Sequence, residues 1–180
     1  MDITNIPISL VLALWNNGSE VTLNDICCNI IKSNLTNDYN LEMRKKFGTK
    51  GFPDCIIYNK DKAHCIIEFK LTKQCESLKR SVCQVMCYIY NKYKHSIIPI
   101  KDIIVWTEKS ICIFKWNDLE LLYENFICFY KNEAPTTYWD ICPCKSLFSD
   151  LDKLIFKKIE INKLDFSYFT KNYICYGNYS

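Results

Sequence analysis

The spacing of apolar residues predicts two long helices separated by a group of strands. A helix that begins near Ser19 or Thr22 and ends near Ser33 has its apolar face at Leu23, Ile26, Ile30 and Ile31. A second, longer helix is predicted from about residue 73 to residue 94, with a buried stripe at Leu78, Val82, Val85 and Ile89. Both patterns have the three- or four-residue spacing that places side chains on one face of an α-helix.

Short runs rich in β-branched and aromatic residues predict the strands. They are Tyr39 to Arg44, DCIIY (54–58), HCIIEFK (64–70), IIVWT (103–107) and ICIFK (111–115). A polar turn at residues 59–62 joins the second and third runs, which therefore read as a hairpin. The predicted order, α-β-β-β-α-β-β, is typical of an α/β fold.

The two ends of the chain extend this core. Residues 117–180 are predicted to form a helical C-terminal extension that packs on the same domain as residues 1–116. The apolar run at residues 6–15 is shorter than the ~20 residues that span a bilayer, and it lacks the basic flank of a signal peptide. We therefore expect a buried N-terminal helix in an intracellular protein of the cytoplasm or nucleus, without membrane association.

Composition adds little about partners but does bear on the cysteines. The chain has 180 residues, 49% of them apolar, which is enough for one packed core, and its net charge of +3 does not by itself indicate a nucleic-acid binder. In an intracellular protein we expect the twelve cysteines to be mostly reduced core residues. The close pair at Cys142 and Cys144 lacks the spacing of a zinc or iron–sulfur site.

Two acidic residues and a lysine are predicted to meet on one side of the hairpin. Glu68 and Lys70 are two residues apart on one strand, so both point to the same face, while Phe69 points the other way. Asp54 opens the neighbouring strand and can lie beside them. Two adjacent carboxylates repel unless a cation lies between them, and Mg²⁺ prefers such oxygen ligands.

The following helix offers a second polar group. Gln84 and Tyr88 are four residues apart and therefore share one helical face, on the flank of the buried stripe and alongside Arg80 and Ser81. Amide, phenol, hydroxyl and guanidinium groups together suit contact with a phosphate backbone or a base.

These motifs resemble those of a known superfamily. Gly51-Phe52-Pro53-Asp54, followed after thirteen residues by Glu68-Phe69-Lys70, resembles the PD-(D/E)XK signature of the restriction-endonuclease-like nucleases. Gln84-Val85-Met86-Cys87-Tyr88 resembles the Q-hydrophobic-x-x-Y motif of the RecB-like branch. The resemblance covers roughly residues 20–115. It implies an αβββαβ core with a mixed sheet flanked by helices, and phosphodiester hydrolysis that depends on Mg²⁺ or Mn²⁺.

The resemblance also implies a role for each residue. Asp54, Glu68 and the carbonyl of Phe69 would bind the metal, and Lys70 would be the catalytic lysine. Gln84 and Tyr88 would organise the site and position the substrate. The family usually takes a further acid from its first helix; Glu20 is the preferred candidate, and Glu42 on the first strand is the alternative.

A nucleic acid is the expected substrate, with DNA favoured over RNA. Its phosphates would meet a basic group of residues, namely Arg44, Lys45, Lys46, Lys50 and Arg80. Two alternatives stay open: a viral cap-snatching type of RNA endonuclease, although those sites usually have an early histidine and none precedes His64, and a catalytically silent module for nucleic-acid binding or assembly. The sequence leaves open whether the chain forms a homo-oligomer or joins a larger complex.

Overall fold

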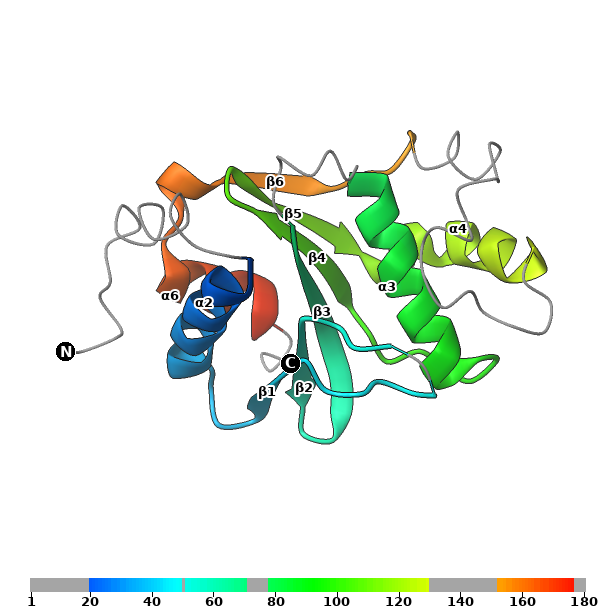
Figure 1. The fold of residues 1–180 in the computed structure, drawn as a ribbon, viewed down its shortest axis with the longest axis horizontal. Coiled ribbons are helices and arrows are strands. Elements are labelled where there is room, and N and C mark those ends of the chain that lie inside the picture. The colour runs from blue at the N-terminus through cyan, green and yellow to red at the C-terminus, as the bar shows by residue number, and fades with distance from the viewer. Residues whose placement is uncertain (1–19, 50, 71–77, 130–151, 177–180) are drawn as a thin grey trace.

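A six-stranded sheet lies between two groups of helices in the computed structural model of the chain (Figure 1). The structure describes residues 20–49, 51–70, 78–129 and 152–176. For residues 20–23 and 127–129 it describes the backbone but not the side chains. The strands are β1 (Tyr39–Met43), β2 (Cys55–Asn59), β3 (Lys62–Lys70), β4 (Asp102–Thr107), β5 (Ser110–Lys115) and β6 (Lys157–Glu160). The helices are α2 (Glu20–Asn34), α3 (Leu78–Tyr93), α4 (Trp116–Phe129) and α6 (Phe166–Phe169), with shorter turns η4 (Ile161–Lys163) and η5 (Thr170–Ile174).

The strands lie in the sheet in the order in which they occur in the chain. Neighbouring strands are antiparallel except for β3 and β4, which are parallel. A parallel pair needs a long crossover connection, and the segment that contains α3 supplies it. The predictions of an α/β fold, of the hairpin and of a mixed sheet flanked by helices are therefore confirmed.

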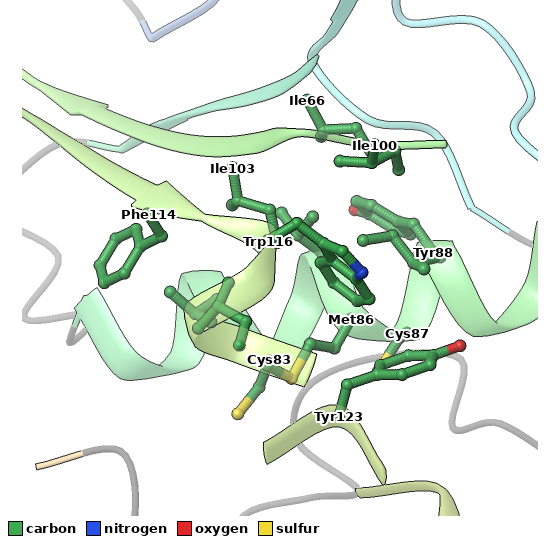
Figure 2. Close-up of a cluster of buried hydrophobic side chains, with 14 of the residues drawn as sticks. Ile66, Cys83, Met86, Cys87, Tyr88, Ile100, Ile103, Phe114, Trp116 and Tyr123 are labelled. Carbon is green, nitrogen blue, oxygen red and sulfur yellow. The ribbon is translucent and has the colours of Figure 1, made fainter. Parts of the chain in front are cut away.

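Each face of the sheet has its own hydrophobic core. On one face α3 and α4 pack on side chains such as Ile66 and Ile103, with Met86 and Trp116 among the buried residues (Figure 2). On the other face α2 and α6 cover the alternate strand positions, such as Ile67. Because both faces are covered, the central strands are almost continuously apolar, and a charged residue within one of them is unusual.

Both predicted long helices are confirmed over the described residues. The four residues of the second apolar stripe all belong to the core on the α3 face, with Leu78 at its margin. The buried surface of α3 is wider than the stripe predicted, because α4 covers a further side of it; Cys83 and Cys87 are also buried. The proposed start of this helix at residue 73 and the proposed N-terminal helix at residues 6–15 lie outside the described residues.

The C-terminal extension is not purely helical, so that prediction was wrong for residues 157–160. There β6 pairs with β5 and becomes the edge of the sheet. Its sequence, Lys-Lys-Ile-Glu, has no apolar alternation because an edge strand is exposed, and charged side chains protect such an edge from pairing with other chains. Further on, Tyr176 donates a hydrogen bond to the buried Asp102 at the start of β4, and Lys115 lies 2.9 Å from the same carboxylate.

Eight described cysteines are buried in the two cores: Cys27, Cys28, Cys55, Cys65, Cys83, Cys87, Cys112 and Cys175. The prediction that the cysteines are core residues is confirmed for these eight, and their reduced state stays a prediction; Cys142 and Cys144 lie outside the described residues. Among the described helices, none has the length and apolar character needed to cross a membrane.

The loop between β1 and β2 packs closely against α3. Phe47 is fully buried, contacts Tyr93 with a ring-centroid distance of 5.8 Å, and donates a backbone hydrogen bond to the Gly51 carbonyl. Gly48 has a φ of +76°, and a Cβ at this position would lie 2.7 Å from the carbonyl oxygen of Asn91. Both its backbone conformation and its contact with the helix therefore require glycine.

We expect Gly48→Ala to lower the free energy of unfolding by at least ~1 kcal/mol, because alanine is strained at this φ and its Cβ meets the backbone of α3. Urea denaturation measures the loss. Thr49→Ala, at the exposed neighbouring position, is the control and should change stability little. Equal stability of Gly48→Ala and the parent protein would contradict the close packing of this loop on α3.

Candidate active site

The β2–β3 hairpin joins Asp54 and Glu68 through each other's backbone. The backbone N–H of Phe69 donates to Asp54 Oδ2 at 2.9 Å, and the backbone N–H of Asp54 lies 3.4 Å from Glu68 Oε1. This reciprocal arrangement follows from the strand register, because Cys55, next to Asp54, pairs with Ile67, next to Glu68. The two carboxylates are therefore adjacent and held in fixed orientations, as the sequence predicted.

Glu68 is an acidic residue in a strand that is otherwise part of the core. Its side chain is only 2% exposed and lies on the α3 face, where its strand partner Val105 also lies. Burial, and then the nearby charge of Asp54, raise the pKa of Glu68 to about 8. In the absence of another cation, this carboxyl is therefore mostly protonated at neutral pH.

Lys70 opposes this effect from the same face. Its Nζ lies 3.3 Å from Glu68 Oε2, and its side chain is 17% exposed, so the ammonium is close to the acid pair and still reaches solvent. Phe69, between them, is buried in the opposite core and stacks on Trp106. The predicted alternation is therefore confirmed, whereas a metal-binding role for the Phe69 carbonyl stays a prediction.

Gln84 and Tyr88 meet on α3, and Tyr88 lies near the acid pair. The amide Nε2 of Gln84 donates to the phenol oxygen of Tyr88 at 2.6 Å. Burial raises the pKa of Tyr88 far above its usual value, and the charges of Glu68 and Asp54 raise it further, so the phenol lies within their field and stays protonated. Gln84 Oε1 is buried without a hydrogen-bond partner among the described residues.

Gly51 makes room for this tyrosine, a role that was not predicted from the sequence. A Cβ on Gly51 would lie 2.5 Å from Tyr88 Cδ1, and its φ of +128° is also suited to glycine. The glycine of the Gly-Phe-Pro-Asp segment thus lets the chain that leads into Asp54 pass directly over the Tyr88 ring. The motif itself contains this glycine, but its role is visible only from the packing of the loop on Tyr88.

The third acid is the least defined member of the site. Glu42 Oε1 lies 3.0 Å from Lys45 Nζ. Burial of Tyr58, and then the charge of Glu42, raise the pKa of Tyr58. The described contacts of Glu42 are therefore with Lys45 and Tyr58. Glu20 begins α2, but its side chain lies outside the description. Within the described residues, no group of three or more His, Cys, Asp or Glu side chains is placed to hold a metal. The choice between Glu20 and Glu42 stays a prediction.

The basic residues predicted to contact nucleic acid are only partly available. Arg44 forms an ion pair with Asp25 of α2, and Lys45 forms the pair with Glu42. Lys46 is exposed, Lys50 lies outside the described residues, and Arg80 is half-buried on α3. The backbone of Arg44 nevertheless bonds that of Asp54, with N–H to carbonyl oxygen at 3.0 Å, so this loop leads directly to the acid pair.

The donor set suits a hard divalent cation. Asp54 and Glu68 supply carboxylate oxygens from two adjacent strands, and Mg²⁺ is usually bound by one or two carboxylates, with water and substrate phosphate completing its coordination. The burial of Glu68 is an independent sign of a cation site. A cation between the carboxylates would offset both causes of the raised pKa of Glu68, namely its burial and the charge of Asp54.

Comparisons with protein-family models, with curated proteins and with solved structures found no match to this chain.

We expect the stability of the metal-free protein to fall as the pH rises from about 4.5 to about 8. Over this range the folded state keeps a proton on Glu68 that the unfolded state has lost, so folding becomes less favourable, by at most about 1.4 kcal/mol per pH unit. Urea denaturation in a chelating buffer at several pH values measures the slope.

Two variants test the source of this slope. Glu68→Gln should flatten it, because an amide does not titrate, whereas Glu120→Gln, at an exposed position of α4, should leave it unchanged. The same slope in the parent protein and in Glu68→Gln would show that Glu68 is not the group that is held protonated by burial.

Proposed function

We propose that the chain is a Mg²⁺- or Mn²⁺-dependent nuclease that hydrolyses phosphodiester bonds, with DNA favoured over RNA. The observation that carries this proposal is the fixed pair of carboxylates, Asp54 and Glu68, with one of them buried in a sheet core. The order α2–β1–β2–β3–α3–β4 is also the order implied by the PD-(D/E)XK resemblance, and it supports the same assignment.

Asp54 and Glu68 would hold the cation at the end of the β2–β3 hairpin. When bound, such a cation lowers the pKa of a coordinated water and stabilises the negative charge that develops on a scissile phosphate. Asp54 keeps its carboxylate in place through the backbone N–H of Phe69, so the geometry does not depend on side-chain packing alone. A rigid site of this kind needs little reorganisation during the reaction.

Lys70 would act on the phosphate. It lies on the same face as Glu68 and near it, and its ammonium retains access to solvent. From there it would stabilise the charge on the non-bridging oxygens or orient the attacking water. Tyr88 and Gln84 would act as positioning residues, since Tyr88 lies within the field of the two carboxylates and is hydrogen-bonded to Gln84.

The two alternatives make different use of the same residues. A silent binding module would need no such carboxylate pair, and the burial of Glu68 would then be unfavourable without serving a role. A cap-snatching type of site would call for a histidine near the acids. His64 instead contacts the rings of Tyr39 and Tyr176, near the beginning of β3, whereas Glu68 lies near its end.

We expect Lys70→Ala to reduce phosphodiester hydrolysis by roughly 10²–10³, since one group placed to stabilise transition-state charge contributes on the order of 3–4 kcal/mol. Binding of the nucleic acid should fall far less. Single-turnover cleavage of labelled DNA and RNA, single- and double-stranded, with Mg²⁺ or Mn²⁺ measures the effect.

The control is Lys62→Ala, which removes an exposed lysine from the other end of the same strand and should leave the rate unchanged. Cleavage by Lys70→Ala at the parent rate would refute the assignment of this lysine. A parent protein that binds nucleic acid but cleaves none of the four substrates with either metal would favour the silent module.

A further inference from the structure

A cavity beside Lys70 has no role in the chemistry described above. Its volume is about 360 Å³, within the range of about 300–1,000 Å³ that is common for ligand pockets. Lys70 forms one side, and the N-terminal turn of α3, the β4–β5 turn and the segment that enters β6 form the others. The cavity therefore begins at the catalytic lysine and extends away from the acid pair.

The sheet register shows where this cavity lies relative to the scissile phosphate. Glu68 pairs with Val105, Val105 with Cys112, and Cys112 with Lys158, so these four residues form one row across the sheet. Val105, Cys112 and Lys158 all line the cavity. Since adjacent strands are ~4.8 Å apart, the row from Glu68 to Lys158 measures roughly 14 Å along the backbone. A nucleic-acid strand bound at the acid pair can follow this row.

The charge of the cavity suits a phosphodiester backbone. Lys70, Lys109 and Lys158 line it, and none of the described residues that line it is acidic. Lys158 forms an ion pair with Glu160 at 3.1 Å, but both side chains are about half exposed. Exposed pairs of this kind contribute little, so Lys158 can exchange Glu160 for a phosphate.

The other lining groups suit a base. Phe156 packs against Phe114 at a ring-centroid distance of 5.0 Å and remains 40% exposed at the cavity, so its ring is available for stacking. Leu78, Val105 and Cys112 supply further apolar surface. Ser81 is 2% exposed, and its buried hydroxyl has no hydrogen-bond partner among the described residues. A base that enters the cavity could supply this partner.

We propose that this cavity binds an unpaired nucleotide next to the scissile phosphate, so that the substrate is single-stranded DNA or the splayed end of a duplex. The inference rests on the proposed function for the position of the scissile phosphate. A base that is paired and stacked in a duplex cannot enter such a pocket without leaving the stack, which costs free energy, whereas an unpaired base pays little of this cost. Recognition by stacking and by lysines is tolerant of sequence.

The test measures binding separately from cleavage. Fluorescence anisotropy compares a labelled oligo(dT) single strand with a blunt hairpin of equal length, with Ca²⁺ in place of Mg²⁺. We expect the parent to prefer the single strand and Lys158→Glu to weaken that binding by about tenfold, because a phosphate contact becomes a repulsion. Lys157→Glu is the matched control: it makes the same charge change one residue earlier on β6, outside the cavity lining, and should have little effect.

A second pair of variants tests stacking. Phe156→Ala should weaken single-strand binding by roughly fivefold or more, as expected for the loss of one base–aromatic contact. Ile155→Ala, at the exposed neighbouring position and outside this cavity, should not. The melting temperature of each variant checks its folding.

Two results would overturn the inference: equal losses in Lys158→Glu and Lys157→Glu, or a Phe156→Ala protein that binds the single strand as tightly as the parent. Failure of the proposed function is distinguishable from both. If the binding pattern is as expected and no cleavage occurs with Mg²⁺ or Mn²⁺, the nucleotide pocket stands and the nuclease assignment fails.

Discussion

The burial of one carboxylate, that of Glu68, is the constraint on which the site depends. A charged group in a sheet core is unfavourable unless it is paired. The nearby carboxylate of Asp54 raises the free energy of the ionised form of Glu68 further. Lys70 and a backbone N–H offset part of this cost. A divalent cation between the carboxylates would offset much of the rest, and this is the physical reason for proposing a metal at this site.

The surrounding structure holds this pair in place from three sides. The hairpin fixes both carboxylates through backbone hydrogen bonds, and the parallel strand β4 and helix α3 enclose Glu68 from the core side. The loop before β2 packs on α3 through Phe47 and allows the Tyr88 ring to lie under Gly51. The C-terminal extension adds β6 at the far edge of the sheet, and it supplies Lys158 and Phe156 to the cavity beside Lys70.

Much of this arrangement could be predicted from local patterns, because it depends on local geometry. Period-two alternation places Glu68 and Lys70 together, and helical spacing places Gln84 beside Tyr88. What could not be predicted depends on contacts between distant segments. The edge strand β6 has no apolar pattern, and the role of Gly51 is visible only once α3 lies against it. The cavity is formed by four separate segments, so no single motif in the sequence could reveal it.

The most direct test of the metal site is anomalous diffraction from crystals grown with Mn²⁺. We expect one peak between the carboxylates of Asp54 and Glu68, and we expect it to disappear in crystals of Asp54→Asn, because the substitution removes one of the two carboxylate ligands of the proposed site. Crystals of the parent protein at saturating Mn²⁺ with no peak at this position, or with the same peak in Asp54→Asn, would contradict the assignment of these two residues as the metal site.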